Sequence, residues 1–175
     1  MKRTGLAALA LCLLLVIPAA GQSAFPLSVQ GSGAVLFPGS GDPQFESHTR
    51  LGWEVQARYT FSRFSLGAGY QRSTVYRLRQ FAFTAALSLG FLEPRYVVAS
   101  GGGFGGYLAG RLGLGKLTCN EECIDKTYAT YGGGGGVLVR VSRRLALDLG
   151  VQYFQVSDTF DSGYLMARTG FSLGL

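Results

Sequence analysis

Residues 163–175 read GYLMARTGFSLGL, and this stretch sorts its side chains onto two faces. One face carries Leu165, Ala167, Thr169, Phe171, Leu173 and Leu175. The other face carries Tyr164, Met166, Arg168, Gly170, Ser172 and Gly174. A period of two is characteristic of a β-strand whose two faces meet different environments. Similar segments recur throughout the chain, so the sequence predicts an all-β fold.

The alternation predicts eight strands. We expect them at about 27–37, 50–61, 64–73, 80–91, 96–112, 128–142, 145–156 and 163–175. In the fourth strand, the expected apolar face consists of Phe81, Phe83, Ala85, Leu87, Leu89 and Phe91. These lengths suit strands that cross a bilayer at a tilt, which need about 9–11 residues.

The expected connections alternate between short and long. Tight turns are predicted at 62–63, 92–95 and 142–144, and longer polar connections at 38–49, 72–79, 113–127 and 157–163. Short periplasmic turns, longer outer loops and an even strand number are the layout of bacterial outer-membrane barrels. The predicted fold is an eight-stranded antiparallel up-and-down transmembrane β-barrel that occupies residues 22–175.

Residues 1–21 have the features of a signal peptide. Lys2 and Arg3 form a basic start, and an apolar run from Leu6 to Ile17 follows. Small residues then lead to Gly21, after which we expect cleavage.

The composition supports membrane-spanning strands. Charged residues make up 15% of the chain, against roughly 25% in soluble domains, and the mean hydropathy is +0.23. No stretch approaches the ~20 apolar residues of a transmembrane helix, so alternating strands must carry the apolar content. The formal charge of +6 is spread without a basic patch, so we expect no binding of nucleic acid.

The face that meets lipid can be chosen from residue types. A soluble lipocalin-type barrel would hold its apolar residues inside. Here the polar face consists mainly of small residues that suit a narrow interior. Aromatic residues lie near strand ends, as in interfacial girdles. They are Phe61, Phe64 and Phe91 on the turn side and Phe37, Trp53, Tyr70, Phe81 and Tyr153 on the loop side. The apolar face is therefore predicted to point outward.

Charged residues fall on the inward face. They are Arg50, Glu54, Arg58, Arg111, Arg140, Asp148 and Arg168. An eight-stranded barrel has room for little more than its own side chains, and unpaired buried charges are costly. We expect a structural network of ion pairs in the lumen, with a selectivity filter as the alternative.

Cys119 and Cys123 form a C-x3-C pair in the longest predicted connection. An oxidising compartment outside the cytoplasm favours a disulfide between them. The alternative is a metal site, but the chain contains no second Cys/His cluster. We therefore expect no bound metal.

Two other patterns are poor candidates for chemistry. Residues 101–106 (GGGFGG) satisfy G-x-G-x-x-G, but no helix follows, so we expect no nucleotide cofactor. With the run 132–136, these glycines are predicted to relieve crowding in the wall, or alternatively to form a lateral opening for apolar ligands. His48 lies beside Ser47 without the spacing of a nucleophile and its base, so no catalytic residue is expected.

The leader, the strands and the terminal segment ending Phe171-Ser172-Leu173-Gly174-Leu175 together resemble the small bacterial outer-membrane β-barrel superfamily. Its members include opacity-protein, OmpX-like and OmpW-like families. They commonly end in Phe, where this chain has Leu175. The resemblance implies a location in the cell outer membrane of Gram-negative bacteria, surrounded by membrane lipids. It also implies recognition of the C-terminal strand by the barrel assembly machinery.

The sequence indicates function only in outline. We expect a monomeric, non-enzymatic barrel that is structural or interacts through its extracellular loops. A narrow, porin-like conduit for small or apolar solutes is the alternative, and a lipid-modifying barrel enzyme is a less favoured one. Functions in the resembled families range over adhesion, stress resistance and passage of small apolar molecules.

Overall fold

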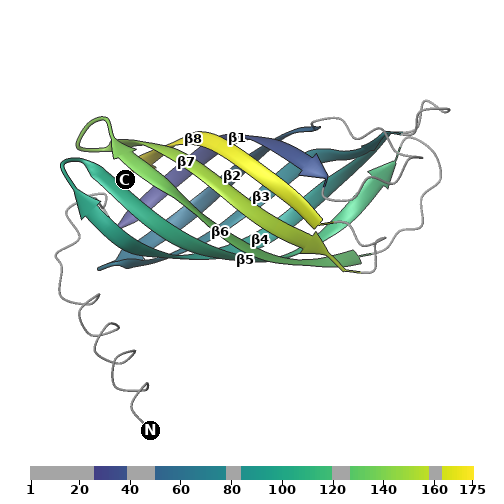
Figure 1. The fold of residues 1–175 in the computed structure, drawn as a ribbon, viewed down its shortest axis with the longest axis horizontal. Helices are drawn as coiled ribbons and strands as arrows, with labels where there is room; N and C mark the ends of the chain where they lie inside the picture. The colour runs from purple at the N-terminus through teal and green to yellow at the C-terminus, as the bar shows by residue number, and fades with distance from the viewer. Residues whose placement is uncertain (1–25, 39–49, 78–83, 120–126, 158–162) are drawn as a thin grey trace, which may run out of the picture.

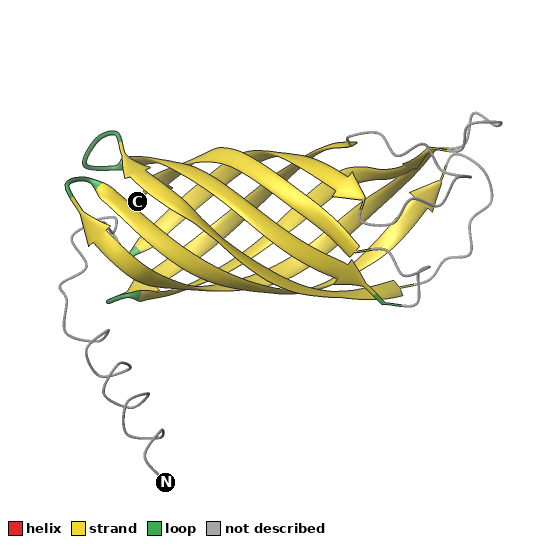
Figure 2. Cartoon of the chain, in the orientation of Figure 1, coloured by secondary structure: helices red, strands yellow, loops and turns green. Residues whose placement is uncertain are grey.

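The computed structural model describes residues 26–38, 50–77, 84–119, 127–157 and 163–175, which form a closed barrel (Figures 1 and 2). Its strands are β1 (Leu27–Pro38), β2 (Arg50–Phe61), β3 (Phe64–Arg77), β4 (Thr84–Gly101), β5 (Phe104–Cys119), β6 (Thr127–Arg140), β7 (Leu145–Val156) and β8 (Gly163–Gly174). Each strand pairs antiparallel with the next, and β8 pairs with β1 to close the sheet. The predicted eight-stranded up-and-down barrel is confirmed. No helix in the described part is long and apolar enough to cross a membrane.

The two ends of the barrel differ. Tight turns join β2 to β3, β4 to β5 and β6 to β7 at one end, where the C-terminus also lies (Figure 1). We call this the turn end. The longer connections lie at the opposite end, which we call the loop end. In the turn at 142–144, the Ser142 hydroxyl accepts hydrogen bonds from the backbone N–H groups of Arg144 and Leu145.

The outer surface of the barrel is apolar. Leu51 on β2, Leu112 and Leu114 on β5 and Phe171 on β8 each leave more than half of their surface exposed. Their strand neighbours on the other face, including Glu54 and Arg168, are buried. The predicted outward faces of β2, β3, β7 and β8 are confirmed. A closed barrel leaves no unpaired strand edge, as a bilayer requires.

Aromatic pairs lie at both ends of this outer surface. The Trp53 and Tyr70 rings are 5.6 Å apart toward the loop end, and the Phe61 and Phe64 rings are 5.0 Å apart at the turn end. This arrangement matches the interfacial girdles of membrane barrels. The prediction was wrong for Phe91, whose side chain is buried in the lumen.

Strand β4 differs from its prediction in facing and in length. Leu87, Leu89 and Phe91 point into the lumen, while Gly90 and Leu92 point outward. No turn occurs at 92–95, because β4 continues to Gly101. The turn lies at 102–103, where two glycines have φ values of 56° and 88°, a left-handed conformation that favours glycine. Strand β5 likewise extends beyond its predicted end, to Cys119.

The reversed face of β4 is explained by an apolar cluster inside the loop-end half of the lumen. The cluster comprises Ala34, Leu36, Leu87, Leu89, Phe91, Phe154, Val156, Tyr164 and Met166. We call it the apolar plug. The Phe154 and Tyr164 rings stack 5.5 Å apart within it. Apolar residues therefore occupy both sides of the wall at this level, and β4 contributes its larger ones to the inside.

Glycines in β6 allow close approach of neighbouring strands. A Cβ at Gly134 would lie 2.6 Å from the Cα of Gln152, and one at Gly136 would lie 2.6 Å from Cζ of Tyr107. Both distances are far below van der Waals contact. The run 132–136 thus relieves crowding inside the wall, as predicted. The prediction was wrong for residues 101–103, where a Cβ would meet nothing within 4 Å.

Candidate functional site

Glu93 on β4 lies at the centre of a buried cluster in the middle of the lumen. Its Oε1 accepts hydrogen bonds from Arg58 Nη2 at 2.7 Å, Arg95 Nε at 2.7 Å and Arg168 Nη2 at 3.0 Å. Its Oε2 accepts from Arg111 Nη2 at 2.8 Å and Arg168 Nη1 at 2.8 Å. One carboxylate thus joins β2, β4, β5 and β8 across the barrel.

Two further carboxylates complete the cluster. Glu54 accepts from Arg111 Nη2 at 2.7 Å and from Arg168 Nη1 at 2.9 Å. Asp148 accepts from Arg95 Nη1 and from the Tyr107 hydroxyl, each at 2.6 Å. Charge-assisted hydrogen bonds of this length are the strong ones, and here they are shielded from solvent.

We call these side chains the charged layer: Glu54, Arg58, Glu93, Arg95, Tyr107, Arg111, Asp148 and Arg168. Four arginines face three carboxylates, so the layer carries a formal charge of 4 − 3 = +1. Glutamine side chains form further hydrogen bonds with the arginines of the layer. Gln71 accepts from Arg111 Nη1 at 2.6 Å, and Gln56 accepts from Arg58 Nη2 at 2.9 Å.

The charged layer rests directly on the apolar plug. The Arg111 guanidinium lies 3.9 Å from the centroid of the Phe91 ring, which belongs to the plug. On the other side, the Arg95 guanidinium lies 4.3 Å from the Tyr107 ring centroid. Cation–π contacts of this kind are stronger when water is excluded. They make the two layers one continuous filling of the lumen.

Five of the seven charged residues named from the sequence come together in this layer, namely Glu54, Arg58, Arg111, Asp148 and Arg168. The other two lie elsewhere. Arg50 is buried at the loop end of β2, and Arg140 is exposed at the turn-end rim. Arg140 therefore lies outside the buried layer, because β6 ends there and its side chain reaches the mouth of the barrel.

Glu93 and Arg95 were missed as site residues because they were assigned to a tight turn. Proline at position 94 favoured that interpretation. The missed signal was the continued alternation, since Phe91, Glu93, Arg95 and Val97 all lie on one face of β4 and are all buried. Tyr107 and the glutamines also belong to this site, and nothing but strand parity could have identified them.

Several other predictions concern residues outside the described part of the chain. Cys123 and His48 lie there, as do residues 1–21. The backbone of Cys119 ends β5. The disulfide and the signal peptide therefore stay predictions.

Comparisons with known proteins place the fold. No family model matches this sequence, and no curated protein does. Among solved structures, Neisserial surface protein A is similar with a TM-score of 0.73 and 18% identity, over 86% of this chain and 97% of that one. Ail, the attachment invasion locus protein of Yersinia pestis, has a TM-score of 0.56 and 11% identity, over 84% and 96%. The N-terminal β-barrel domain of Pseudomonas aeruginosa OprF has a TM-score of 0.52 and 13% identity, over 83% and 96%.

The chain has the fold of the small outer-membrane β-barrels. The predicted resemblance is confirmed at the level of the fold, and the apolar outer surface with aromatic ends agrees with it. Strands of 12 to 18 residues provide enough length to cross a bilayer. The fold and the apolar outer surface are those of a barrel that spans a bilayer, and in the layout of outer-membrane barrels the turn end faces the periplasm.

Proposed function

We propose that the protein is a non-enzymatic outer-membrane barrel with a closed lumen, which acts through the segments that connect its strands at the loop end. The observation that carries this proposal is the filled lumen. The apolar plug occupies its loop-end half, and the charged layer occupies its middle. Together they fill the lumen at these two levels, so the proposal assigns function to the connections between strands and not to the lumen.

The filled lumen argues against a conduit. In the plug, Leu36, Leu89 and Met166 are 0% exposed, so no water reaches them. In the charged layer, Glu93 and Asp148 are also 0% exposed and hold their arginines in fixed geometry. A solute would have to displace both layers, and moving a buried ion from its partners costs several kcal/mol.

Three of the four connecting segments at the loop end are acidic. Of the ten Asp and Glu residues in the sequence, Glu54, Glu93 and Asp148 belong to the charged layer. The other seven lie at positions 42, 46, 121, 122, 125, 158 and 161, all between strands that meet at the loop end. A solved structure of Ail contains the heparin analogue sucrose octasulfate, which is a polyanion. The acidic segments of this chain suit a partner of the opposite charge instead.

Single-channel recording in planar bilayers tests the closed lumen. We expect no conductance steps from the purified protein. A triple variant, Phe154→Ala with Met166→Ala and Arg168→Ala, serves as the positive control because it removes bulk from both layers. Steps from this variant alone support a closed barrel. Steady conductance from the unmodified protein would show that the conduit alternative is correct.

A further inference from the structure

The outward face of the strands carries few charges, and those that the structure describes are positive. Among the described side chains, Arg72 on β3 and Lys116 on β5 are the charged residues of this face. Both are exposed and lie toward the loop end. Ser88 of β4 lies between them, because it is the register partner of each. A charge on the lipid side is costly at the bilayer centre and cheap near its surface, so this level suits the interface.

Of these two cations, Arg72 is the one that remains available. Its strand neighbours Gln71 and Ser73 are buried, so the Arg72 side chain points outward. Its guanidinium has no hydrogen bond or ion pair with any residue that the structure describes. Lys116 already takes part in an interaction within the protein. The N–H donors of Arg72 can therefore serve a group outside the barrel.

Arg72 lines a shallow hollow in the outer wall. The hollow has a volume of about 260 Å³ and lies over β2, β3 and β4. Leu51 and Trp53 provide apolar surface, Thr74 adds a hydroxyl group, and Ala86 contributes only a methyl group. A hollow with one cation, one hydroxyl and apolar surface suits an anionic group that is joined to apolar chains.

The aromatic girdle gives the depth of this hollow in the membrane. Trp53 is the register partner of Arg72, and its ring lies 5.6 Å from the ring of Tyr70. Tyr70 precedes Arg72 by two residues on the same face of β3, toward the turn end. Because aromatic girdles lie at the level of lipid headgroups, Arg72 lies at that level or just beyond it on the loop-end side. In the layout of outer-membrane barrels, this side is the outer leaflet.

We propose that Arg72 and the hollow beside it bind the anionic phosphate of a lipid headgroup in the outer leaflet. Guanidinium groups pair with phosphate through two parallel N–H donors, which provide both charge and geometry. The Thr74 hydroxyl is a further donor, and Leu51 and Trp53 offer apolar surface to the chains of the same lipid. The site belongs to the outer wall, so it is separate from the lumen and from the connections at the loop end.

The fluorescence of Trp53 provides the test, because Trp53 is the only tryptophan in the sequence and lines the hollow. The purified protein is reconstituted into phosphatidylcholine vesicles with increasing fractions of a lipid whose brominated chains quench tryptophan on contact. One series uses brominated phosphatidylcholine, whose phosphate is neutralised by choline. The other uses brominated phosphatidic acid, whose phosphate keeps its negative charge. The two quenching curves give the relative binding constant for phosphatidic acid over phosphatidylcholine.

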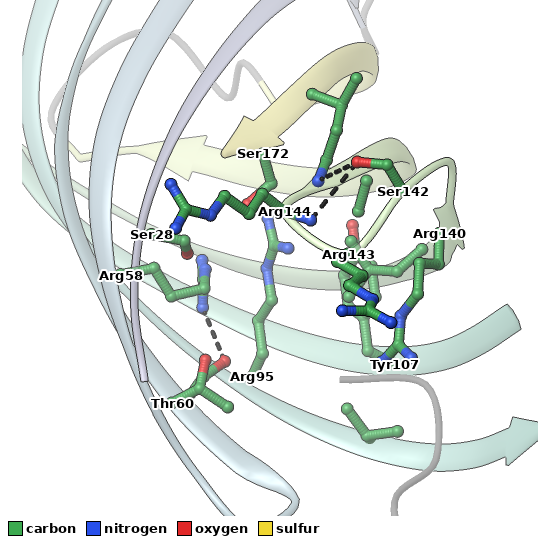
Figure 3. Close-up of a pocket in the computed structure, with 15 residues that line it drawn as sticks. Ser28, Arg58, Thr60, Arg95, Tyr107, Arg140, Ser142, Arg143, Arg144 and Ser172 are labelled. Atoms are coloured by element: carbon green, nitrogen blue, oxygen red, sulfur yellow. Dashed lines mark hydrogen bonds between the residues drawn. The ribbon is translucent and has the colours of Figure 1, made fainter. Parts of the chain in front are cut away.

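The test variant is Arg72→Gln. The matched control is Arg143→Gln, which removes the same charge from an exposed side chain at the opposite end of the barrel. Figure 3 shows Arg143 there, beside the turn-end mouth of the lumen. Heat-modifiable migration in electrophoresis checks that each variant is folded before its fluorescence is measured.

We expect the native protein to prefer phosphatidic acid about fivefold, which is the effect of one cation near a membrane surface. Arg72→Gln should reduce this preference to about one, and Arg143→Gln should leave it unchanged. The proposal is overturned if the native protein shows no preference, if Arg72→Gln keeps it, or if Arg143→Gln loses it to the same extent.

Discussion

The loop-end half of the lumen is filled by apolar side chains and its middle by charged ones, although the same eight strands enclose both. The apolar plug packs aliphatic and aromatic side chains such as Leu89 and Phe154. The charged layer, next to it, holds Glu93 among four arginines. Dispersion and burial stabilise the plug without directional demands. The charged layer depends on fixed geometry, because a missing partner leaves a buried charge.

This difference makes the two levels unequal in what they tolerate. An apolar filling accepts changes in shape at moderate cost, since neighbours can move into the space. A buried ion network tolerates loss of one member poorly, and its removal as a whole can be nearly neutral. The comparison therefore predicts an order of sensitivity along the barrel axis.

The largest effect should come from Glu93→Gln. The variant leaves four buried arginines with two carboxylates, so we expect a loss near the upper end of roughly 3–5 kcal/mol in the free energy of unfolding. Urea titration of the protein in lipid vesicles measures it. The double variant Glu93→Gln with Arg58→Gln restores the formal balance to that of the native layer and should recover part of the loss. Equal stability of the single variant and the native protein would contradict the central role of Glu93.

Phe154→Ala tests the plug and should cost less. The side chain is 1% exposed and stacks on Tyr164, so its truncation creates a cavity. We expect a loss near the lower end of about 3–5 kcal/mol, because the flexible Met166 can fill part of the space. Phe171→Ala is the matched control, since Phe171 is 57% exposed on the outer face. If both variants lose the same stability in the urea titration, the plug is not a packed core.

Val55→Arg tests whether the outward face of β2 lies in the lipid, and at what depth. Val55 lies mid-strand on β2 with its side chain outward, so a charge there should cost about 2–4 kcal/mol. Val141→Arg makes the same change at the turn-end interface, where the cost should be only about 0–1 kcal/mol. Reversible folding into vesicles compares the two variants. Equal losses would show that the assigned membrane depth is wrong.

The smallest effects are expected from alanine substitutions at two glycines, one with free space around it and one in close contact with a neighbouring strand. Gly90 faces outward, and a Cβ there would meet nothing closer than the Leu114 carbonyl oxygen at 3.8 Å. Gly90→Ala should therefore stabilise the strand by roughly 0.5–1 kcal/mol. Gly134→Ala would force Gln152 and the adjacent backbone apart and should destabilise the barrel instead. Thermal unfolding in micelles should shift in opposite directions for the two variants.

The outer surface of this barrel was predictable because the residues that face lipid must be apolar on every strand. The alternation in β2 and β8 therefore identified both faces correctly. The inside follows no such rule. Leu87, Leu89 and Phe91 look identical to a lipid-facing series until their neighbours across the lumen are known.

The site was predictable only where charge stood out. Arg58, Arg111 and Arg168 could be assigned to the lumen because a charge on the lipid face is expensive. Glu93 could not, because the proline beside it suggested a turn and local pattern alone did not reveal the extra length of β4. The pairing of its carboxylate with arginines of four strands depends on barrel closure, which no local segment encodes.

Arg168 favours the native register of the β1–β8 pairing, which closes the barrel. It lies on β8, opposite Ala34 of β1, and reaches both Glu54 and Glu93. A slip of one residue between these strands would turn Arg168 toward lipid and leave two carboxylates in the lumen without it. A barrel with this wrong register would therefore lose stability twice, through a charge in lipid and through carboxylates that lack an arginine in the lumen. The contacts of Arg168 with Glu54 and Glu93 therefore add to the preference of β8 for its native register with β1.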